Sequence, residues 1–355
     1  MNGALARHRW PGLDGLRGFA VLAVVAFHLG VAPGGFVGVD VFFVLSGFLI
    51  TRLLIAEHDR TGTVQLPRFY ARRALRLYPA LVVVVIFCLM VAVVTGRAVA
   101  ETTHDAIASL LYVTNIVGTQ GGLLSHTWTL ALEEQFYLVW PALLLLCLWL
   151  RRMTGSTWLG WLPAVGLVVG VLVVDLLQGR TGVAHTYVRA MGLPLGCVLA
   201  LVRLEHLAWV ARIAWPAGIA LALTVFVDLP PELTAGWPMS VGALLAAPVV
   251  AALVSTHGGL FATRWPRYFG LRSYSLYLWH LPVISLAVHQ APDFVPHSLA
   301  MTLGMAASLV AAEMSYRYVE MPVNSWRNRR LASARPAEGP LDSPVNEGSG
   351  ARGGS

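Results

Sequence analysis

Residues 13–28 read LDGLRGFAVLAVVAFH, an apolar run that carries Asp14 and Arg17 near its start and ends on His28. A charged side chain at the centre of a bilayer costs about 2.5–3.5 kcal/mol on insertion scales, so ionisable residues within a span indicate a functional or structural role. His28 follows Arg17 by eleven residues. At about 100° and 1.5 Å per residue, the two side chains lie within about 20° of one helix face, about 16 Å apart. Asp14, three residues before Arg17, is placed to pair with it.

The composition of the whole chain is that of a membrane protein. Its 355 residues are 57% hydrophobic and 12% charged, about half the charged share of a soluble domain. The formal net charge of +7 fits basic cytoplasmic loops and does not require a nucleic-acid partner. The three cysteines lie in apolar runs and show neither a disulfide framework nor metal-ligand spacing. We therefore expect a helical bundle in the lipid bilayer, with no metal site and no nucleic acid.

Ten runs are long and apolar enough to span a membrane, which takes about 20 residues. They are residues 12–31, 37–55, 77–95, 130–150, 158–177, 186–203, 209–228, 238–256, 271–290 and 299–320. Residues 104–118 are too short and polar for a span, and we expect a re-entrant or surface helix there. Basic residues concentrate in the loops on the side of the N-terminus, so the positive-inside rule places both termini in the cytoplasm.

The predicted fold is therefore all-α, a polytopic membrane bundle of about ten transmembrane helices. Residues 1–325 form the membrane domain in this interpretation. Residues 326–355 are rich in Pro, Gly, Ser and charge, a composition that predicts a disordered cytoplasmic tail.

A second polar group starts the fourth predicted span, where residues 126–141 read HTWTLALEEQFYLVWP. By the predicted topology, His126, Trp128 and Glu133 lie in the outer half of the bundle. A carboxylate that orients an imidazole is a familiar general-base arrangement, so Glu133, or another buried polar group, is expected to orient His28. The alternative is that the acidic residues face lipid headgroups at the outer interface.

A third group, RFYARRALRLYPA at residues 68–80, is basic and precedes the third predicted span. Arg72, Arg73 and Arg76 lie within about one helical turn. Planar guanidinium groups bind phosphates through paired hydrogen bonds. The alternative is that the arginines only mark the cytoplasmic side and contact anionic lipid headgroups.

A fourth group is LRSYSLYLWHLP at residues 271–282. Ser273, Tyr277 and His280 share one helix face at positions i, i+4 and i+7. A polar stripe at this depth faces the bundle interior or a water-filled cavity. For His28, a core histidine that is hydrogen-bonded to a neighbour remains the alternative.

These stretches, together with GVDVFFVLSGFLIT and YRYVEMP, occur in an order that resembles the membrane-bound acyltransferase-3 family. The resemblance covers about residues 10–325. It implies a ten-span bundle that moves acyl groups from cytoplasmic acyl-CoA to hydroxyl groups. Family acceptors include envelope polysaccharides, lipopolysaccharide, peptidoglycan and glycosylated natural products such as macrolides.

The resemblance also implies roles for individual residues. Arg17 and His28 match the Arg-x10-His motif of the family, in which His28 would be the essential imidazole. Arg73 and Arg76 match the Arg-x2-Arg motif associated with CoA phosphates. Glu133 matches the acidic position after the Trp-Ser/Thr-Leu signature. Many members carry a C-terminal SGNH esterase-like domain, and this sequence shows none, which favours an acceptor that enters the bundle itself.

The sequence thus predicts an O-acyltransferase of the bacterial cytoplasmic membrane, with no permanently bound cofactor and with acyl-CoA, expected to be acetyl-CoA, as co-substrate. The expected acceptor is a hydroxylated glycan or a glycosylated small molecule. A proton-coupled transporter or exporter of such molecules is the alternative, because intramembrane Arg, His and Glu also mark transport paths. The predicted catalytic residues are His28, Glu133 and Arg17, the donor-binding residues are Arg72, Arg73 and Arg76, and the cavity residues are Asp14, His126, Trp128, Ser273, Tyr277 and His280.

Overall fold

The computed structural model describes residues 10–119, 122–155, 162, 165–170, 173, 189–202, 210–228, 240–256 and 258–333. Within these ranges the chain forms helices and no strand, which confirms the predicted all-α class. In chain order the elements are α1 (Pro11–His28), α2 (Val37–Thr61), α3 (Leu66–Thr95), α4 (Val99–Leu110), α5 (Thr114–Val117), η2 (Ser125–Thr127), α6 (Trp128–Thr154), α9 (Gly192–Leu201), α10 (Val210–Thr224), α11 (Val241–Ser255), η6 (Gly259–Ala262), α12 (Arg264–Leu271), α13 (Ser273–His289), α14 (His297–Ser315), η7 (Tyr316–Glu320) and α15 (Met321–Ser333).

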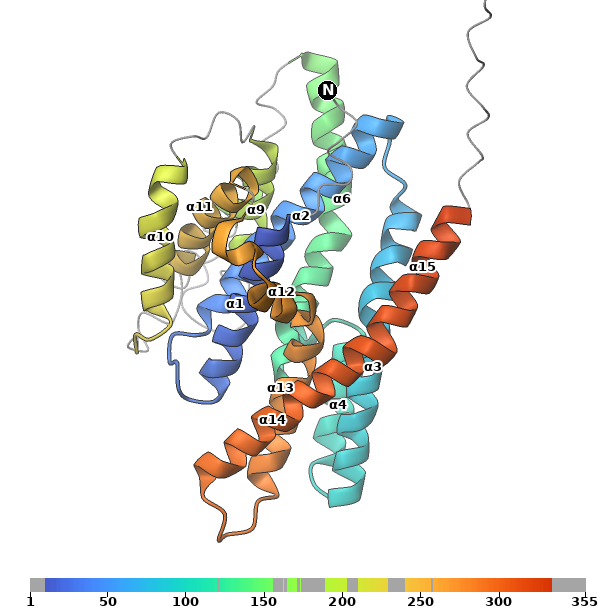
Figure 1. Ribbon diagram of the computed structural model, residues 1–355. Coiled ribbons are helices and arrows are strands. Elements are labelled where there is room, and N and C mark those ends of the chain that lie inside the picture. The colour runs from blue at the N-terminus through green and yellow to red at the C-terminus, as the bar shows by residue number, and fades with distance from the viewer. Residues whose placement is uncertain are drawn as a thin grey trace, which may run out of the picture.

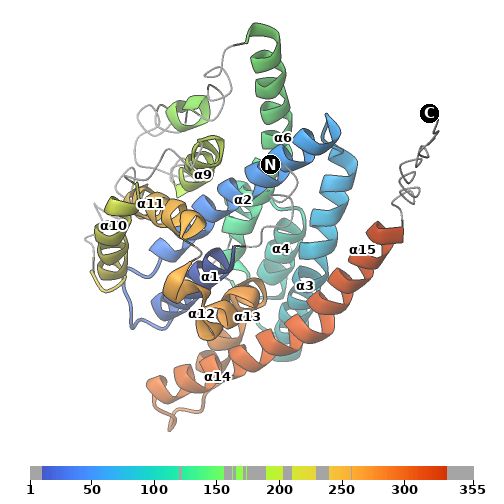
Figure 2. The same ribbon diagram turned by 45° about the horizontal axis from the view of Figure 1, so that its top comes forward.

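The helices form two groups joined through the middle of the molecule. Helices α9, α10 and α11 pack on one side of α1 and α2, and α3, α4 and α15 lie on the other side (Figures 1 and 2). Helices α14 and α15, linked by the π-helical turn η7, continue as one long rod across the bundle (Figure 1). Helices α1, α12 and α13 lie between the two groups (Figure 2), and this is where the candidate site forms.

Several helices have the length and composition of membrane spans. The long apolar helices are Val37–Thr61, Leu66–Thr95, Ser125–Thr154 and His297–Arg330, and the shorter apolar ones are Gly192–Leu201, Arg212–Thr224 and Val241–Ser255. The count of ten spans and the cytoplasmic placement of both termini stay predictions. The predicted span 158–177 lies largely outside the described residues.

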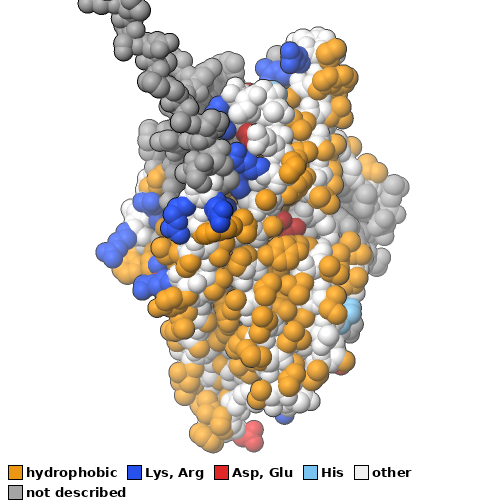
Figure 3. Space-filling view, turned by 90° about the vertical axis from the view of Figure 1, so that its right-hand side faces the viewer, with side chains coloured by type: hydrophobic (Ala, Val, Ile, Leu, Met, Phe, Trp, Pro, Cys, Tyr) orange, Lys and Arg blue, Asp and Glu red, His pale blue; other side chains and the backbone are white. Residues whose placement is uncertain are grey.

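One face of the molecule shows the surface expected for contact with lipid. Figure 3 shows a broad apolar surface, with arginines gathered towards one end of it. On α3, the side chains of Ile86, Met90 and Val94 are exposed by 49%, 55% and 85%. A contiguous apolar surface of this kind would be costly in water, and a bilayer covers it.

Three boundaries differ from the sequence prediction. The basic stretch 68–80, expected to precede the third span, is part of the same helix, because α3 starts at Leu66 and continues through Pro79. Residues 104–118 form the end of α4 and the short α5, separated by Tyr112, whose φ of 53° interrupts a helix. Helix α15 extends to Ser333, so the predicted boundary at residue 325 falls inside a helix.

Glycines on α1 set how closely the neighbouring segment approaches. A Cβ atom on Gly15 would overlap the backbone oxygen of Phe261, and one on Gly18 would overlap that of Pro266. Small residues three apart lie on one helix face and let two backbones meet. Arg17 projects at least about 100° away from these glycines, because each residue turns the helix by about 100°. The glycine contacts thereby fix the direction in which Arg17 points.

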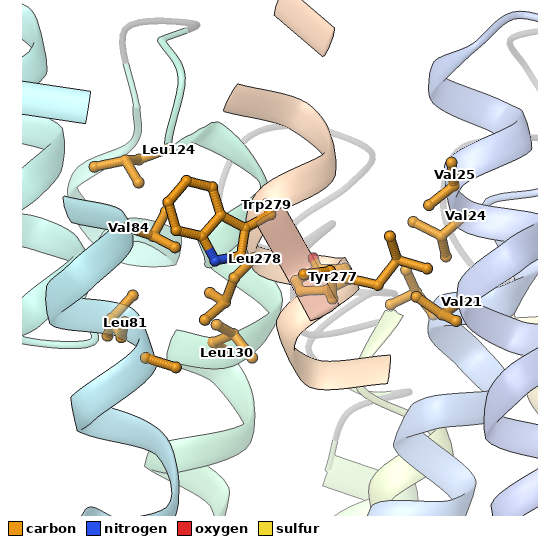
Figure 4. Packing of buried hydrophobic residues seen from close by; sticks show 14 of the residues in the cluster. Val21, Val24, Val25, Leu81, Val84, Leu124, Leu130, Tyr277, Leu278 and Trp279 are labelled. Atoms are coloured by element: carbon orange, nitrogen blue, oxygen red, sulfur yellow. The ribbon is translucent and has the colours of Figure 1, made fainter. Parts of the chain in front are cut away.

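Helix α13 lies in the centre of the largest hydrophobic core. Figure 4 shows it between α3, which contributes Leu81 and Val84, and α1, which contributes Val21 and Val24. All four side chains are almost completely buried. Ser273, Tyr277 and His280 of α13 therefore lie inside the bundle, where only other buried polar groups or an enclosed cavity can satisfy them.

Candidate active site

Three histidines from three elements form what we term the histidine cluster. His28 ends α1, His126 lies in η2, and His280 lies in α13. The ring centroids of His28 and His280 are 4.9 Å apart, and those of His126 and His280 are 5.3 Å apart. His280 is fully buried and His126 is 4% exposed. Within the described ranges, no group of three or more His, Cys, Asp or Glu side chains is arranged to hold a metal ion.

The contacts of His280 and His28 determine which ring nitrogen carries the proton in the neutral form of each. His280 Nδ1 lies 2.6 Å from the carbonyl oxygen of Tyr277, which can only accept, so this Nδ1 carries the proton and Nε2 is an acceptor. His28 Nδ1 faces two acceptors, His280 Nε2 at 3.3 Å and the Val24 carbonyl oxygen at 2.9 Å. The proton of His28 is therefore held on Nδ1, which leaves a lone pair on Nε2.

Tyr277 links the histidine cluster to the start of α6. Its hydroxyl donates to the backbone oxygen of His126 at 2.6 Å and lies 2.6 Å from the hydroxyl of Thr129. Trp128 is half-buried beside them, and its ring packs edge-on against Phe43. Three of the predicted cavity residues therefore lie next to one another, namely Tyr277, His126 and Trp128. A fourth, His280, belongs to the histidine cluster.

A small cavity of about 60 Å³ lies next to Tyr277 and is lined by Ser46 and Glu133, among others. Ser46 donates a hydrogen bond of 2.6 Å to Glu133. Arginines, Arg73 foremost, attract the Glu133 carboxylate electrostatically. Glu133 follows His126 by seven residues, so the helical rise carries it about 10 Å away from the cluster. The sequence analysis expects either Glu133 or another buried polar group to orient His28. The contacts favour the second case, with His280 as that group.

A larger cavity of about 700 Å³, which we term the arginine vestibule, opens at the other end of α1. Six arginines line it against three carboxylates, so the cavity carries a positive excess. The charged lining residues are Arg17, Arg52, Arg60, Arg72, Arg76, Arg327, Asp14, Glu57 and Glu320.

The two cavities meet at one point. Arg17, Ser273 and Tyr274 line both of them. The Nε atom of Arg17 is buried and has no hydrogen-bond partner among the residues that the structure describes. A donor group at this junction is therefore available to a molecule that passes from the vestibule into the small cavity. Both Arg17 and Ser273 were predicted site residues.

The three arginines predicted to act together on α3 are split between two environments. Arg72 and Arg76 share a helix face at i, i+4 and line the arginine vestibule. Arg73, turned by about 100° from Arg72, points to α6 instead. It donates a hydrogen bond of 2.7 Å to Glu134, and its guanidinium lies 3.3 Å from the ring centroid of Tyr137. Arg73 therefore braces α3 against α6 and is absent from the vestibule lining.

Several lining residues were not singled out as site residues from the sequence. Arg52, Arg60 and Arg327 come from α2 and α15 and complete the vestibule. Glu320 accepts a hydrogen bond from Ser275, which holds it at the vestibule wall. The signal that could have identified these arginines in the sequence is the cluster of basic helix ends on one side of the membrane.

The fold and the site define a helical membrane protein in which a basic cavity leads towards buried histidines. The chain belongs to the acyltransferase-3 family, because the model of that acyltransferase domain matches residues 10–313. This assignment agrees with the resemblance found in the sequence. No solved structure matches the chain.

Curated relatives of this chain are bacterial O-acetyltransferases. It is similar to the peptidoglycan O-acetyltransferase OatA of Listeria monocytogenes, with 35% identity over 88% of this chain and 55% of the relative. The putative peptidoglycan O-acetyltransferase YrhL of Bacillus subtilis is 31% identical over 90% of this chain and 55% of the relative. The O-acetyltransferase OatA of Staphylococcus aureus is 32% identical over 88% of this chain and 57% of the relative. The chain thus spans about half the length of these relatives.

Proposed function

We propose that this protein transfers an acyl group, with acetyl as the simplest case, from acyl-CoA to a hydroxyl group of a carbohydrate in the bacterial cell envelope. The observation that carries the proposal is the connection from the arginine vestibule, past Arg17, to the small cavity lined by Tyr277, whose hydroxyl bonds to the backbone of His126 in the histidine cluster. The names of the relatives support acetyl as the group and peptidoglycan as the kind of acceptor.

The vestibule suits the nucleotide end of acyl-CoA. That end carries a pyrophosphate and a 3′-phosphate, and arginine binds phosphate through paired, charge-assisted hydrogen bonds. Six arginines line a volume of about 700 Å³, within the range of ligand-binding pockets. The vestibule also lies at the end of α1 and α2 that the arginine distribution places in the cytoplasm, where acyl-CoA is made.

The histidine cluster suits the transfer step. In the proposed reaction, Nε2 of His28 removes the proton from the acceptor hydroxyl while its oxygen attacks the thioester carbonyl carbon. The tetrahedral intermediate then collapses, the carbon–sulfur bond breaks, and the proton passes from His28 to the leaving CoA thiolate. The products are the O-acyl ester and free CoA, and the imidazole returns to its starting form. His280 acts as a positioning residue, because it holds the other proton of His28 on Nδ1.

A thiol-release assay with the purified protein in proteoliposomes tests this function. With acetyl-CoA and a glycan acceptor, we expect protein-dependent release of free CoA and an acetyl mass increase on the glycan. His28→Ala should lower the rate by about 10²- to 10⁴-fold, as for loss of a general base. Retained transfer in a normally expressed His28→Ala protein would contradict the role of His28. No thiol release by the unmodified protein, with the acceptor crossing the membrane unchanged, would instead favour transport.

A further inference from the structure

A second group of buried polar side chains lies beside the histidine cluster and has no role in the donor path. Arg189, three residues before α9, places its guanidinium carbon 5.0 Å from the ring centroid of Trp128 and 5.5 Å from that of Phe36. Its Nε and Nη2 atoms are buried and have no hydrogen-bond partner in the described part of the chain. These two nitrogens form the edge of the guanidinium that binds paired oxygen atoms side by side.

Asp40 on α2 is equally unsatisfied. It is 1% exposed, and neither carboxylate oxygen has a hydrogen-bond partner among the described residues. The positive charge of Arg189 attracts the Asp40 carboxylate, yet neither carboxylate oxygen has a hydrogen bond to Arg189. Buried polar groups in native proteins are nearly always hydrogen-bonded, because leaving them unpaired is costly. A buried charged donor and a buried charged acceptor that do not bond to each other are both available to a molecule that bonds to both.

This group adjoins the reacting end of the site. Arg189 is close enough to interact electrostatically with Tyr277, whose hydroxyl donates to the backbone of His126. Asp40 and the vestibule residue Arg60 are twenty residues apart on α2, which separates them by about 30 Å along the helix axis. The group therefore lies at the end of the bundle opposite the vestibule, away from the proposed donor entrance.

We infer that Arg189, Asp40 and Trp128 form the subsite for a sugar ring of the acceptor, placed beside the hydroxyl to be acylated. The inference rests on the proposed function and deepens it. Sugar hydroxyls both donate and accept, so adjacent hydroxyls bond to a carboxylate and a guanidinium at once. The ring also presents apolar C–H faces, which suit the aromatic walls of Trp128 and Phe36. A purely apolar acceptor leaves both charged side chains unsatisfied, and a purely anionic one leaves Asp40 unsatisfied.

Equilibrium binding of a peptidoglycan-derived GlcNAc–MurNAc disaccharide to the full chain in nanodiscs, without any donor, tests the subsite directly. The main variant is Arg189→Lys, which keeps the positive charge opposite Asp40 but loses the paired nitrogens. We expect its Kd for the disaccharide to rise at least about tenfold, the effect of losing one good hydrogen bond to a charged group. The matched control is Arg97→Lys, because Arg97 is exposed beyond the end of α3.

Acetyl transfer in the same preparation separates this inference from the proposed function. With Arg189→Lys and with Asp40→Asn, the KM for the disaccharide should rise while the KM for acetyl-CoA stays within about twofold. Disaccharide Kd values equal to those of the unmodified protein in both variants, or no binding by the unmodified protein, would overturn the subsite. Absence of CoA release by the unmodified protein, with disaccharide binding still weakened by Arg189→Lys, would refute acyl transfer but support the sugar subsite. A thermal unfolding curve for each variant shows whether it has folded.

Discussion

Replacement of His280 by leucine tests how the base of the proposed reaction is oriented. His28 Nδ1 has two acceptors, His280 Nε2 at 3.3 Å and the Val24 carbonyl oxygen at 2.9 Å. His280→Leu removes the first and leaves the second. The neutral form of His28 with the proton on Nδ1 is then less favoured, and a larger share of the molecules carries the proton on Nε2. That share cannot accept a proton from the acceptor hydroxyl.

The size of the effect follows from the strength of one hydrogen bond. A neutral hydrogen bond contributes about 0.5–1.5 kcal/mol, which corresponds to a change of about two- to twelvefold in the ratio of the two ring forms. We therefore expect kcat to fall by at most that factor, because the productive fraction cannot change more than the ratio does. The KM values for acetyl-CoA and for the glycan should stay unchanged, because His280 is buried and neither reactant is proposed to bind to it. A residue that itself removes the proton would cost about 10²- to 10⁴-fold.

Steady-state thiol release with saturating acetyl-CoA measures this effect. His280→Gln should recover most of the lost rate, because its side-chain oxygen reaches a position similar to Nε2 and accepts the same hydrogen bond. His289→Leu is the control on the same helix, since His289 is exposed and bonds only to the Ser285 carbonyl within the described structure. A loss of about 100-fold or more with His280→Leu would show that His280 is the base. An unchanged kcat would show that the Val24 carbonyl alone is sufficient.

Two further predictions concern the donor cavity and the packing of α1. Arg76→Gln should raise the KM for acetyl-CoA about tenfold, the effect of losing one charge-assisted hydrogen bond to phosphate, and should not change the KM for acetyl-pantetheine, which lacks the nucleotide. Equal effects on both donors would place the phosphates elsewhere. Gly270→Ala should destabilise the protein by about 1–3 kcal/mol, because the added Cβ overlaps the backbone oxygen of Asp14 and neither backbone can move aside easily. The thermal midpoint of the purified protein measures this, and an unchanged midpoint would refute the close contact between α1 and α12.

The sequence by itself determined the helices and the residues that share a helix face. Apolar runs of about 20 residues form helices because a bilayer leaves backbone groups no partners outside the helix. The period of the helix then places Ser273, Tyr277 and His280 on one buried side of α13. The same period places Arg17 and His28 at the two ends of one face of α1. These relations need no information beyond residue spacing, because they lie within a single helix.

Only the tertiary structure decided which faces meet. The pairing of Ser46 with Glu133 joins residues 87 positions apart, and the contact of His28 with His280 joins residues 252 positions apart. Such contacts depend on the crossing of helices, which the close approach at Gly15 and Gly18 controls on α1. Arg189 and Asp40 likewise show no local pattern that links them. The helical period is a property of one segment, whereas the neighbours of a buried side chain are set by the packing of every helix around it.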